Sequence, residues 1–261
     1  MSKNTYQQCT KTVLDNIADP NIVFDENGVC NYWYEYQAAA KDGLIHGEAG
    51  EKKWQETVAL LKEEGKNKKY DCIIGVSGGV DSTYIAYLVK KAKLRPLVVH
   101  FDNGWNSEIA VNNITKIIEY LDADLYTLVI NWEEFRDLQR AYLKAGVIDI
   151  EALTDHAIFG TLYKLAAKHQ LKYVISGSNL ETEQVLPKAW VFNKVDPINI
   201  TDIHNQYGEV KLKTYPLFSI AKKKYYLNFK KLTSFSPIDW APYNKEKIKA
   251  IITKEIGWQD Y

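Results

Sequence analysis

The sequence is poor in cysteine and carries no excess of either charge. Its 261 residues include three cysteines, and 33 basic side chains balance 33 acidic ones. Three cysteines are too few, and too odd in number, for a disulfide framework. A net charge of +0 argues against a general nucleic-acid binder, because such proteins neutralise the phosphate backbone with excess Lys and Arg. We therefore expect neither a disulfide-rich secreted scaffold nor a nucleic-acid partner.

Long apolar runs are missing as well. The first eight residues lack the apolar stretch of a signal peptide, and no run approaches the roughly 20 residues that cross a membrane. With 46% hydrophobic and 25% charged residues, the composition is that of a globular chain. We therefore expect a cytoplasmic protein with no membrane partner, long enough for one sizeable domain with additions at either end.

What the sequence does contain is an alternation of strand-like and helix-like segments. Short apolar runs that suit buried strands occur at 71–76, 97–101, 125–130 and 173–176. Helices are expected at 51–65, from 81 onward, at 109–121 and at 155–170. This alternation predicts an α/β fold with a doubly wound parallel sheet, in which ligands bind at the carboxyl ends of the strands. The expected parts are an irregular N-terminal lead (1–50), the α/β domain (51–220) and a short C-terminal helical tail (221–261).

The segment at 73–83 is the most informative part of the chain. A glycine turn at 77–79 separates a buried strand from a helix that begins near Asp81. Backbone N–H groups at the start of a helix, next to glycines that let a ligand approach, form a cradle for anions. Asp81 would repel phosphate unless it holds a Mg²⁺ ion that the phosphates share. The expected nucleotide contacts in this segment are Val76, Ser77, Gly78, Gly79, Asp81, Ser82 and Thr83.

This segment differs from two common phosphate-binding motifs. It lacks the Gly-Lys-Ser/Thr ending of a Walker A loop and the Gly-x-Gly-x-x-Gly spacing of a dinucleotide fingerprint. The string Ser-Gly-Gly-Val-Asp-Ser at 77–82 instead resembles the PP-loop of the ATP pyrophosphatase superfamily, whose fold is adenine nucleotide alpha hydrolase-like. The resemblance implies that ATP is cleaved between its α and β phosphates, that AMP is left on a substrate oxygen, and that ATP and Mg²⁺ are required.

Two later strands also end in polar loops. After the second strand, the residues at 101–103 lie where a base or ribose could bind, although Asp-Asn-Gly is also good turn chemistry. After the fourth strand, the superfamily often has a Mg²⁺-binding carboxylate six residues beyond a glycine, which corresponds to Glu183. An acidic first helical turn explains the same composition. The expected nucleotide contacts here are Phe101, Asp102, Asn103, Gly177, Ser178 and Asn179, and the expected metal ligands are Asp81 and Glu183.

Several segments outside the loop resemble the N-acetyl sugar amidotransferase family. They lie at 19–32, 154–158, 177–179, 186–190 and 215–217 and so extend across most of the chain. Members of that family convert the acetamido group of a nucleotide-activated sugar into an acetamidino group, for surface glycans such as the lipopolysaccharide O-antigen. The resemblance implies that the amide oxygen attacks the α-phosphate of ATP to form an O-adenylyl imidate, and that ammonia then displaces AMP.

The same resemblance implies the partners and two further site residues. The substrate would be a nucleotide-linked acetamido sugar, and a separate glutaminase subunit would supply ammonia; a homo-oligomer is compatible with this scheme. Asp155 and His156, at the start of a helix, would be catalytic residues that touch the substrate. A capping Asp and a buried His explain the same two residues without any catalytic role.

The chain departs from the family at its cysteines. Family members usually carry two Cys-x-x-Cys units near the N-terminus, which suggest a structural zinc site. Here the two units begin at Cys9 and Cys30 but end in Thr12 and Trp33. Closed zinc sites need four ligands, so no zinc is expected.

Two other functions remain open. A tRNA-modifying ATP pyrophosphatase shares the loop, but it would need a basic surface, and the persulfide type would need cysteines near the active edge, where none follows Cys72. A degenerate nucleotide-binding paralogue is suggested by the lost cysteines. The intact loop with Asp81 and Glu183 argues against it.

Overall fold

A parallel sheet forms the centre of the protein. The computed structural model describes residues 5–183, 185–187, 190 and 193–261. Its five-stranded sheet has the order β3-β2-β1-β4-β5, and all neighbouring strands are parallel. The strands are β1 (Cys72–Gly75), β2 (Pro96–Asp102), β3 (Leu125–Val129), β4 (Tyr173–Ile175) and β5 (Thr233–Phe235). The doubly wound α/β fold is confirmed, with a change of winding direction between β1 and β4; β5 was not predicted.

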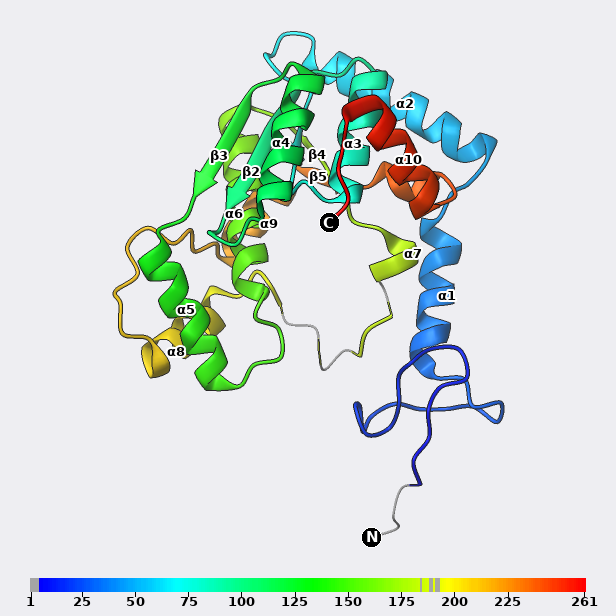
Figure 1. Cartoon of the computed structure of the whole chain (residues 1–261), viewed down its shortest axis with the longest axis vertical. Helices are drawn as coiled ribbons and strands as arrows, with labels where there is room; N and C mark the ends of the chain where they lie inside the picture. The colour runs from blue at the N-terminus through cyan, green and yellow to red at the C-terminus, as the bar shows by residue number, and fades with distance from the viewer. Residues whose placement is uncertain (1–4, 184, 188–189, 191–192) are drawn as a thin grey trace.

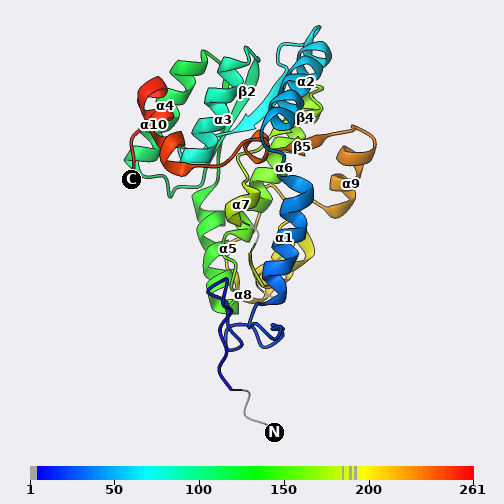
Figure 2. The ribbon, with the colours of Figure 1, turned by 90° about the vertical axis from the view of Figure 1, so that its right-hand side faces the viewer.

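Helices cover both faces of this sheet (Figure 1). Figure 2 shows α3 (Val80–Lys91), α4 (Glu108–Leu121) and α10 (Lys245–Ile256) on one face and α9 (Ile220–Asn228) on the other, which α6 (Ala152–Lys168) also covers. In β1, Ile74 packs into the first core and Ile73 into the second. Successive side chains of a strand point to opposite faces, so a strand covered on both sides is apolar at every position.

A further group of helices lies beyond the carboxyl ends of the strands (Figure 1). α5 (Trp132–Ala145) packs against α8 (Pro197–Tyr207), and the first turns of α6 join their core. On α5, the buried Glu134 carboxylate accepts hydrogen bonds from the backbone N–H groups of residues 213–215. This carboxylate therefore ties the loop after α8 to α5.

The N-terminal lead is more ordered than the sequence predicts. Isolated bridges at Gln8–Asp15 and Phe24–Cys30 form two small turns, as expected of an irregular lead. The helix α1 (Asn31–Gly43) follows them, however, so the prediction of irregular structure up to residue 50 is wrong. The signal was weak because α1 has no side-chain cap and no acidic residue in its first turn, and buries only Tyr32. The polar helix expected at 51–65 is present as α2 (Glu48–Gly65).

The C-terminal part is built into the sheet and its core. β5 extends the sheet beside β4, and Ile248 and Ile252 of α10 are buried in the same core as Val89 of α3. The predicted division at residue 221 therefore does not coincide with a break in packing. No helix in the described part of the chain is both long and apolar enough to cross a membrane.

Candidate active site

The loop between β1 and α3 has the geometry of an anion cradle. Gly78 has a φ of +79°, and a Cβ at this position would lie 2.6 Å from the carbonyl oxygen of Ala110. Only glycine fits such a position without strain. Gly79 is the N-cap of α3 and offers no side-chain cap, so the N–H groups of the first turn stay available to a ligand.

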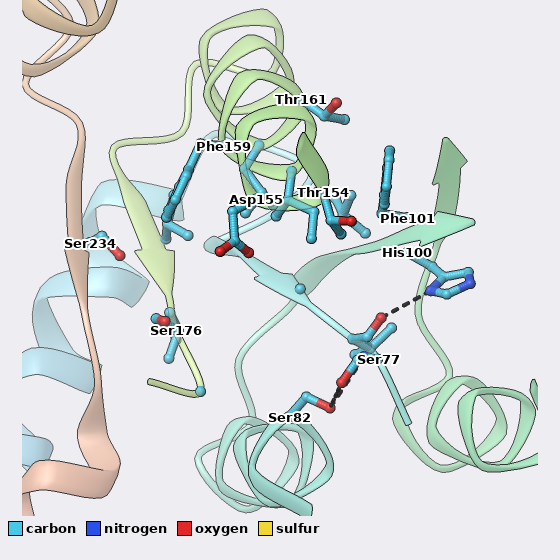
Figure 3. A pocket seen from close by; sticks show the side chains of 18 of the residues that line it. Ser77, Ser82, His100, Phe101, Thr154, Asp155, Phe159, Thr161, Ser176 and Ser234 are labelled. Carbon is cyan, nitrogen blue, oxygen red and sulfur yellow. Dashed lines mark hydrogen bonds between the residues drawn. The ribbon is translucent and has the colours of Figure 1, made fainter. Parts of the chain in front are cut away.

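Two serine hydroxyls meet inside this loop. Ser77 Oγ and Ser82 Oγ lie 3.2 Å apart, and both belong to the wall of the cavity shown in Figure 3. Thr83 behaves differently from the prediction that it contacts a nucleotide. Its side chain is fully buried, and its hydroxyl donates a 2.7 Å hydrogen bond to the carbonyl oxygen of Gly79. Thr83 therefore stabilises the first turn of α3 and does not face a ligand.

A cavity of about 360 Å³ opens beside the loop. It lies between the carboxyl ends of β1, β2 and β4 and the first turns of α6, with Asp155 and Thr154 on the α6 side and Ser77 and Ser82 on the loop side (Figure 3). Its volume is in the range of small-molecule sites, roughly 300–1,000 Å³. Of the predicted residues, the cavity brings together Val76, Ser77, Ser82, Phe101, Asn103, Asp155 and Gly177.

Sequence reasoning missed several polar residues of this wall. Thr154 Oγ1 is buried and has no hydrogen-bond partner in the described part of the chain, as a group reserved for a ligand would. His100 bonds through Nδ1 to the carbonyl oxygen of Val76 at 3.0 Å, while its Nε2 lies 3.2 Å from the amide nitrogen of Asn106. Because a carbonyl only accepts, the ring proton sits on Nδ1 and Asn106 donates to Nε2. In the sequence, only the position of these residues near the ends of predicted strands and helices indicated that they could line a site.

Asp81 and Glu183 come from different elements and approach the same region. Asp81 lies in the first turn of α3, and Glu183 ends the short helix α7 (Leu180–Glu183). Burial raises the pKa of the Glu183 carboxyl, and the negative charges of Asp81 and Asp239 raise it further. A bound cation would relieve this repulsion, and carboxylate oxygens suit Mg²⁺. Among the residues that the structure describes, no group of three or more His, Cys, Asp or Glu could hold a metal, so phosphate or water oxygens would complete the coordination.

Asn179 supplies an unused donor next to these carboxylates. Its side chain is 1% exposed, and its Nδ2 has no hydrogen-bond partner in the described residues. Its backbone N–H donates to Glu183 Oε2 at 3.2 Å, and its Oδ1 accepts the N–H of Glu181 at 2.9 Å. A buried donor without a partner costs about 1–3 kcal/mol, so the group fits a ligand that brings an acceptor oxygen. The residues present thus fit a magnesium–phosphate group.

The two residues predicted to be catalytic at the start of α6, Asp155 and His156, differ in their surroundings. Asp155 lines the cavity and forms an ion pair with Lys194, which also lies 3.6 Å from Asp149. His156 is fully buried; its Nδ1 lies 2.9 Å from the carbonyl oxygen of Lys194, and its Nε2 accepts the N–H of Phe218 at 2.8 Å. Burial lowers the pKa of His156, which keeps the ring neutral. The predicted catalytic contact of His156 is therefore wrong: the ring holds two backbone segments together.

The remaining predicted contacts lie outside the cavity wall: Gly78, Gly79, Asp81, Asp102, Ser178 and Asn179. Asp102 Oδ1 accepts the N–H of Gly104 at 3.0 Å and the amide of Asn106 at 3.1 Å, so the carboxylate shapes its own turn. The carbonyl of Ser178 accepts the Ser236 hydroxyl at 2.6 Å. The backbone N–H of Asn179 donates to Glu183. Lys188 and Ala189 of the 186–190 segment lie outside the described residues.

Hydrogen bonds hold the two cysteines of the lead close together. Cys9 Sγ accepts the N–H of Lys11 at 3.4 Å and that of Cys30 at 3.2 Å, and Thr12 Oγ1 lies 3.7 Å from Cys30 Sγ. Burial raises the pKa of Cys9, but the hydrogen bonds outweigh burial and lower the pKa to about 7. Thr12, where the resemblance would place a cysteine, therefore lies beside Cys30. The absence of zinc stays a prediction.

Comparisons with known proteins find only distant structural similarity. No protein-family model matches the chain, and no curated protein matches it significantly. Among solved structures, it is similar to NMN synthetase from Francisella tularensis (17% identity, 82% of this chain and 89% of that one, TM-score 0.39). It is also similar to the NH3-dependent NAD synthetase from Campylobacter jejuni (18%, 79% and 85%, TM-score 0.41) and to a U34-tRNA thiolase from Methanococcus maripaludis (12%, 98% and 74%, TM-score 0.40). Such weak similarities establish neither the family nor the reaction of this chain. The function is therefore argued from the strand order, the loop and the cavity.

Proposed function

We propose that the chain is an ATP pyrophosphatase-type amidotransferase. It transfers AMP to the acetamido oxygen of a nucleotide-linked sugar and lets ammonia replace that oxygen, which yields an acetamidino group. The observation that supports the ATP half is the 77–82 loop, which includes Asp81, has Glu183 nearby and opens onto the cavity at the carboxyl ends of the strands. The sugar half is supported by the family-like segments of the sequence.

The cavity and the loop suit the two ends of ATP. Phe101, Ile158 and Leu162 give the cavity an apolar wall for a base. The serine hydroxyls and the open first turn of α3 would receive the phosphates. Asp81 and Glu183 would hold Mg²⁺, which would neutralise charge on the phosphates during transfer.

The reaction needs alignment and charge stabilisation more than a protein nucleophile. The amide oxygen attacks the α-phosphorus, the bond to the β-phosphate oxygen breaks, and pyrophosphate leaves. Ammonia then adds to the imidate carbon, and AMP departs with the former amide oxygen, while one proton is released. The loop would hold pyrophosphate in line with the attacking oxygen. Asp155, on the opposite wall, would meet the substrate.

Ammonia must reach this site from outside the chain. Cys9 and Cys30 belong to the small core of the lead. Cys72 is fully buried in β1, and burial raises the pKa of its thiol well above the ordinary value. A cysteine nucleophile needs an accessible thiolate, which Cys72 does not offer. A separate glutaminase subunit therefore completes the proposal.

Labelled nitrogen tests this function. The chain, ATP, Mg²⁺ and UDP- or CMP-linked acetamido sugars are incubated with either ¹⁵N-ammonium or amide-¹⁵N-glutamine, with and without a glutaminase subunit. Labelled amidino sugar is expected from ammonium with the chain alone, and from glutamine only when the glutaminase is present. Efficient transfer from glutamine by the isolated chain would overturn the assignment of ammonia supply. Failure of every acetamido sugar with ammonium would overturn the sugar half.

A further inference from the structure

The carbonyl group of Gly78 is held by the far end of the chain. Trp258 Nε1 donates a 2.8 Å hydrogen bond to the Gly78 oxygen, across a sequence separation of 180 residues. Asn113 Nδ2, from α4, donates to the same oxygen at 3.2 Å. Trp258 is 3% exposed and Asn113 is fully buried. Both acceptor positions of a loop carbonyl are thus occupied from inside the protein.

The Asn113 amide is itself locked by the C-terminal segment. The N–H of Gln259 donates to Asn113 Oδ1 at 2.9 Å, and Asn113 Nδ2 donates to the Gln259 carbonyl at 2.9 Å. Lys116, one turn further along α4, donates to the carbonyl of Gly257 at 2.6 Å. Residues 257–259 therefore lie along α4 through backbone contacts, and the amide of Asn113 has one orientation.

These contacts determine which way the Gly78–Gly79 peptide faces. A trans peptide is planar, so its carbonyl and its N–H point in opposite directions. Because the Gly78 carbonyl points at Trp258 and Asn113, the N–H of Gly79 points the other way, where Ser77 Oγ lies at 3.4 Å. Glycine adopts positive and negative φ with similar ease, so a Gly-Gly peptide without such contacts can flip. A flipped peptide would turn an oxygen toward the phosphates.

We propose that Trp258 and Asn113 are positioning residues for nucleotide binding. They keep the Gly79 N–H directed into the phosphate cradle, so docking of the C-terminal segment sets the affinity of the loop for pyrophosphate. This inference rests on the proposed function, because it takes the loop to be the pyrophosphate site. It goes beyond that function by making the last residues of the chain part of the machinery that shapes the loop.

The test uses a substitution that removes the indole N–H donor, and a second Trp→Phe variant controls for the smaller ring. Trp258→Phe keeps an aromatic ring in the core but lacks the N–H donor. Full-length wild type and variant, labelled with ¹⁵N-glycine, are compared by the Gly79 amide resonance and by calorimetric titration with pyrophosphate and Mg²⁺. The Gly79 resonance should shift in the variant, and the dissociation constant for pyrophosphate should rise about tenfold, the loss of one hydrogen bond. Trp54→Phe, on α2, is the matched control and should change neither quantity.

A second variant covers the case in which Trp258→Phe unfolds. Asn113→Asp keeps the acceptor for the Gln259 N–H but removes the donor that the carbonyls of Gly78 and Gln259 share. It should also shift the Gly79 resonance and weaken binding. An unchanged Gly79 resonance and unchanged affinity in a folded variant would overturn the positioning role. Wild-type protein that binds neither pyrophosphate nor ATP would overturn the proposed function instead. If the wild type binds neither ligand, the Gly79 resonance still shows whether Trp258 and Asn113 orient the Gly78–Gly79 peptide.

Discussion

The hydroxyl group of Tyr243 donates a 2.9 Å hydrogen bond to Asp81 Oδ1, although 162 positions separate the two residues in sequence. Tyr243 lies between the short helix η2 (Pro237–Trp240) and α10, and Asp81 lies in the first turn of α3. Burial raises the pKa of Tyr243, and the hydrogen bond to Asp81 raises it further, so the phenol is a neutral donor near pH 7. This contact orients the carboxylate through Oδ1, and Oδ2 is the oxygen that the proposed Mg²⁺ would use.

Tyr243→Phe should weaken Mg²⁺ binding, so that turnover needs more Mg²⁺, without unfolding the chain. A hydrogen bond to a charged group contributes about 1.5–3 kcal/mol, so the Mg²⁺ concentration for half-maximal turnover should rise by at least about tenfold. The measurement is a magnesium titration of the rate at saturating ATP. Tyr87→Phe, further along α3, is the control and should titrate like wild type. Identical curves for Tyr243→Phe and wild type would show that the phenol does not orient a metal ligand.

Asp81→Asn should nearly abolish turnover while the protein stays folded. A carboxylate inside a phosphate cradle is favourable only if it binds a cation, and an amide cannot replace its charge. Rates are measured across Mg²⁺ concentrations, and circular dichroism and the melting temperature check the fold. Rates near those of wild type at low Mg²⁺ would remove Asp81 from the metal site.

The residues around this loop show what the sequence could and could not predict. The strand, glycine turn and helix at 71–91 carry a local pattern, so the loop and the parallel sheet were predictable. Tyr243 and Trp258 carry no such pattern, because their role comes from where α10 packs, a tertiary effect. His156 shows the opposite error: a resemblance suggested a catalytic residue, but burial and two backbone partners make it structural.

The stability of the α5 region should depend on pH through Glu134. Burial alone would raise the pKa of this carboxyl, but hydrogen bonds from the backbone of residues 213–215 outweigh burial and lower the pKa below its ordinary 4.5. A depressed pKa contributes stability above the unfolded-state value, and that stability is lost as the pH falls through the folded-state value. Wild type should therefore lose melting temperature below about pH 4.5.

Glu134→Gln is the corresponding variant. The glutamine amide turns a donor toward backbone donors, and each orphaned buried donor costs about 1–3 kcal/mol, so the variant should melt at lower temperature at pH 7. Its melting temperature should also fall less steeply than that of wild type as the pH drops below about 4.5. Glu133→Gln, on the exposed side of the same turn, is the control. Parallel pH profiles for Glu134→Gln and wild type would contradict the assignment.

Purified protein should carry no stoichiometric zinc. The lead offers only the thiols of Cys9 and Cys30, and two thiolates do not close a tetrahedral site. Elemental analysis of the wild type checks this, and the double variant Thr12→Cys with Trp33→Cys serves as the positive control, which should gain about one Zn²⁺ per chain. One tightly held Zn²⁺ in the wild type would mean that other side chains supply the missing ligands.

The products of ATP turnover test the central claim most directly. The chain is incubated with ATP, Mg²⁺, ammonium and the acetamido sugars labelled with ¹⁸O in the amide, and the nucleotide products are identified by ³¹P NMR and mass spectrometry. The account predicts AMP and pyrophosphate in equal amounts, with the ¹⁸O in AMP, because the loop lacks the Walker lysine and the amide oxygen leaves with the adenylyl group. ADP and inorganic phosphate as the products would contradict it.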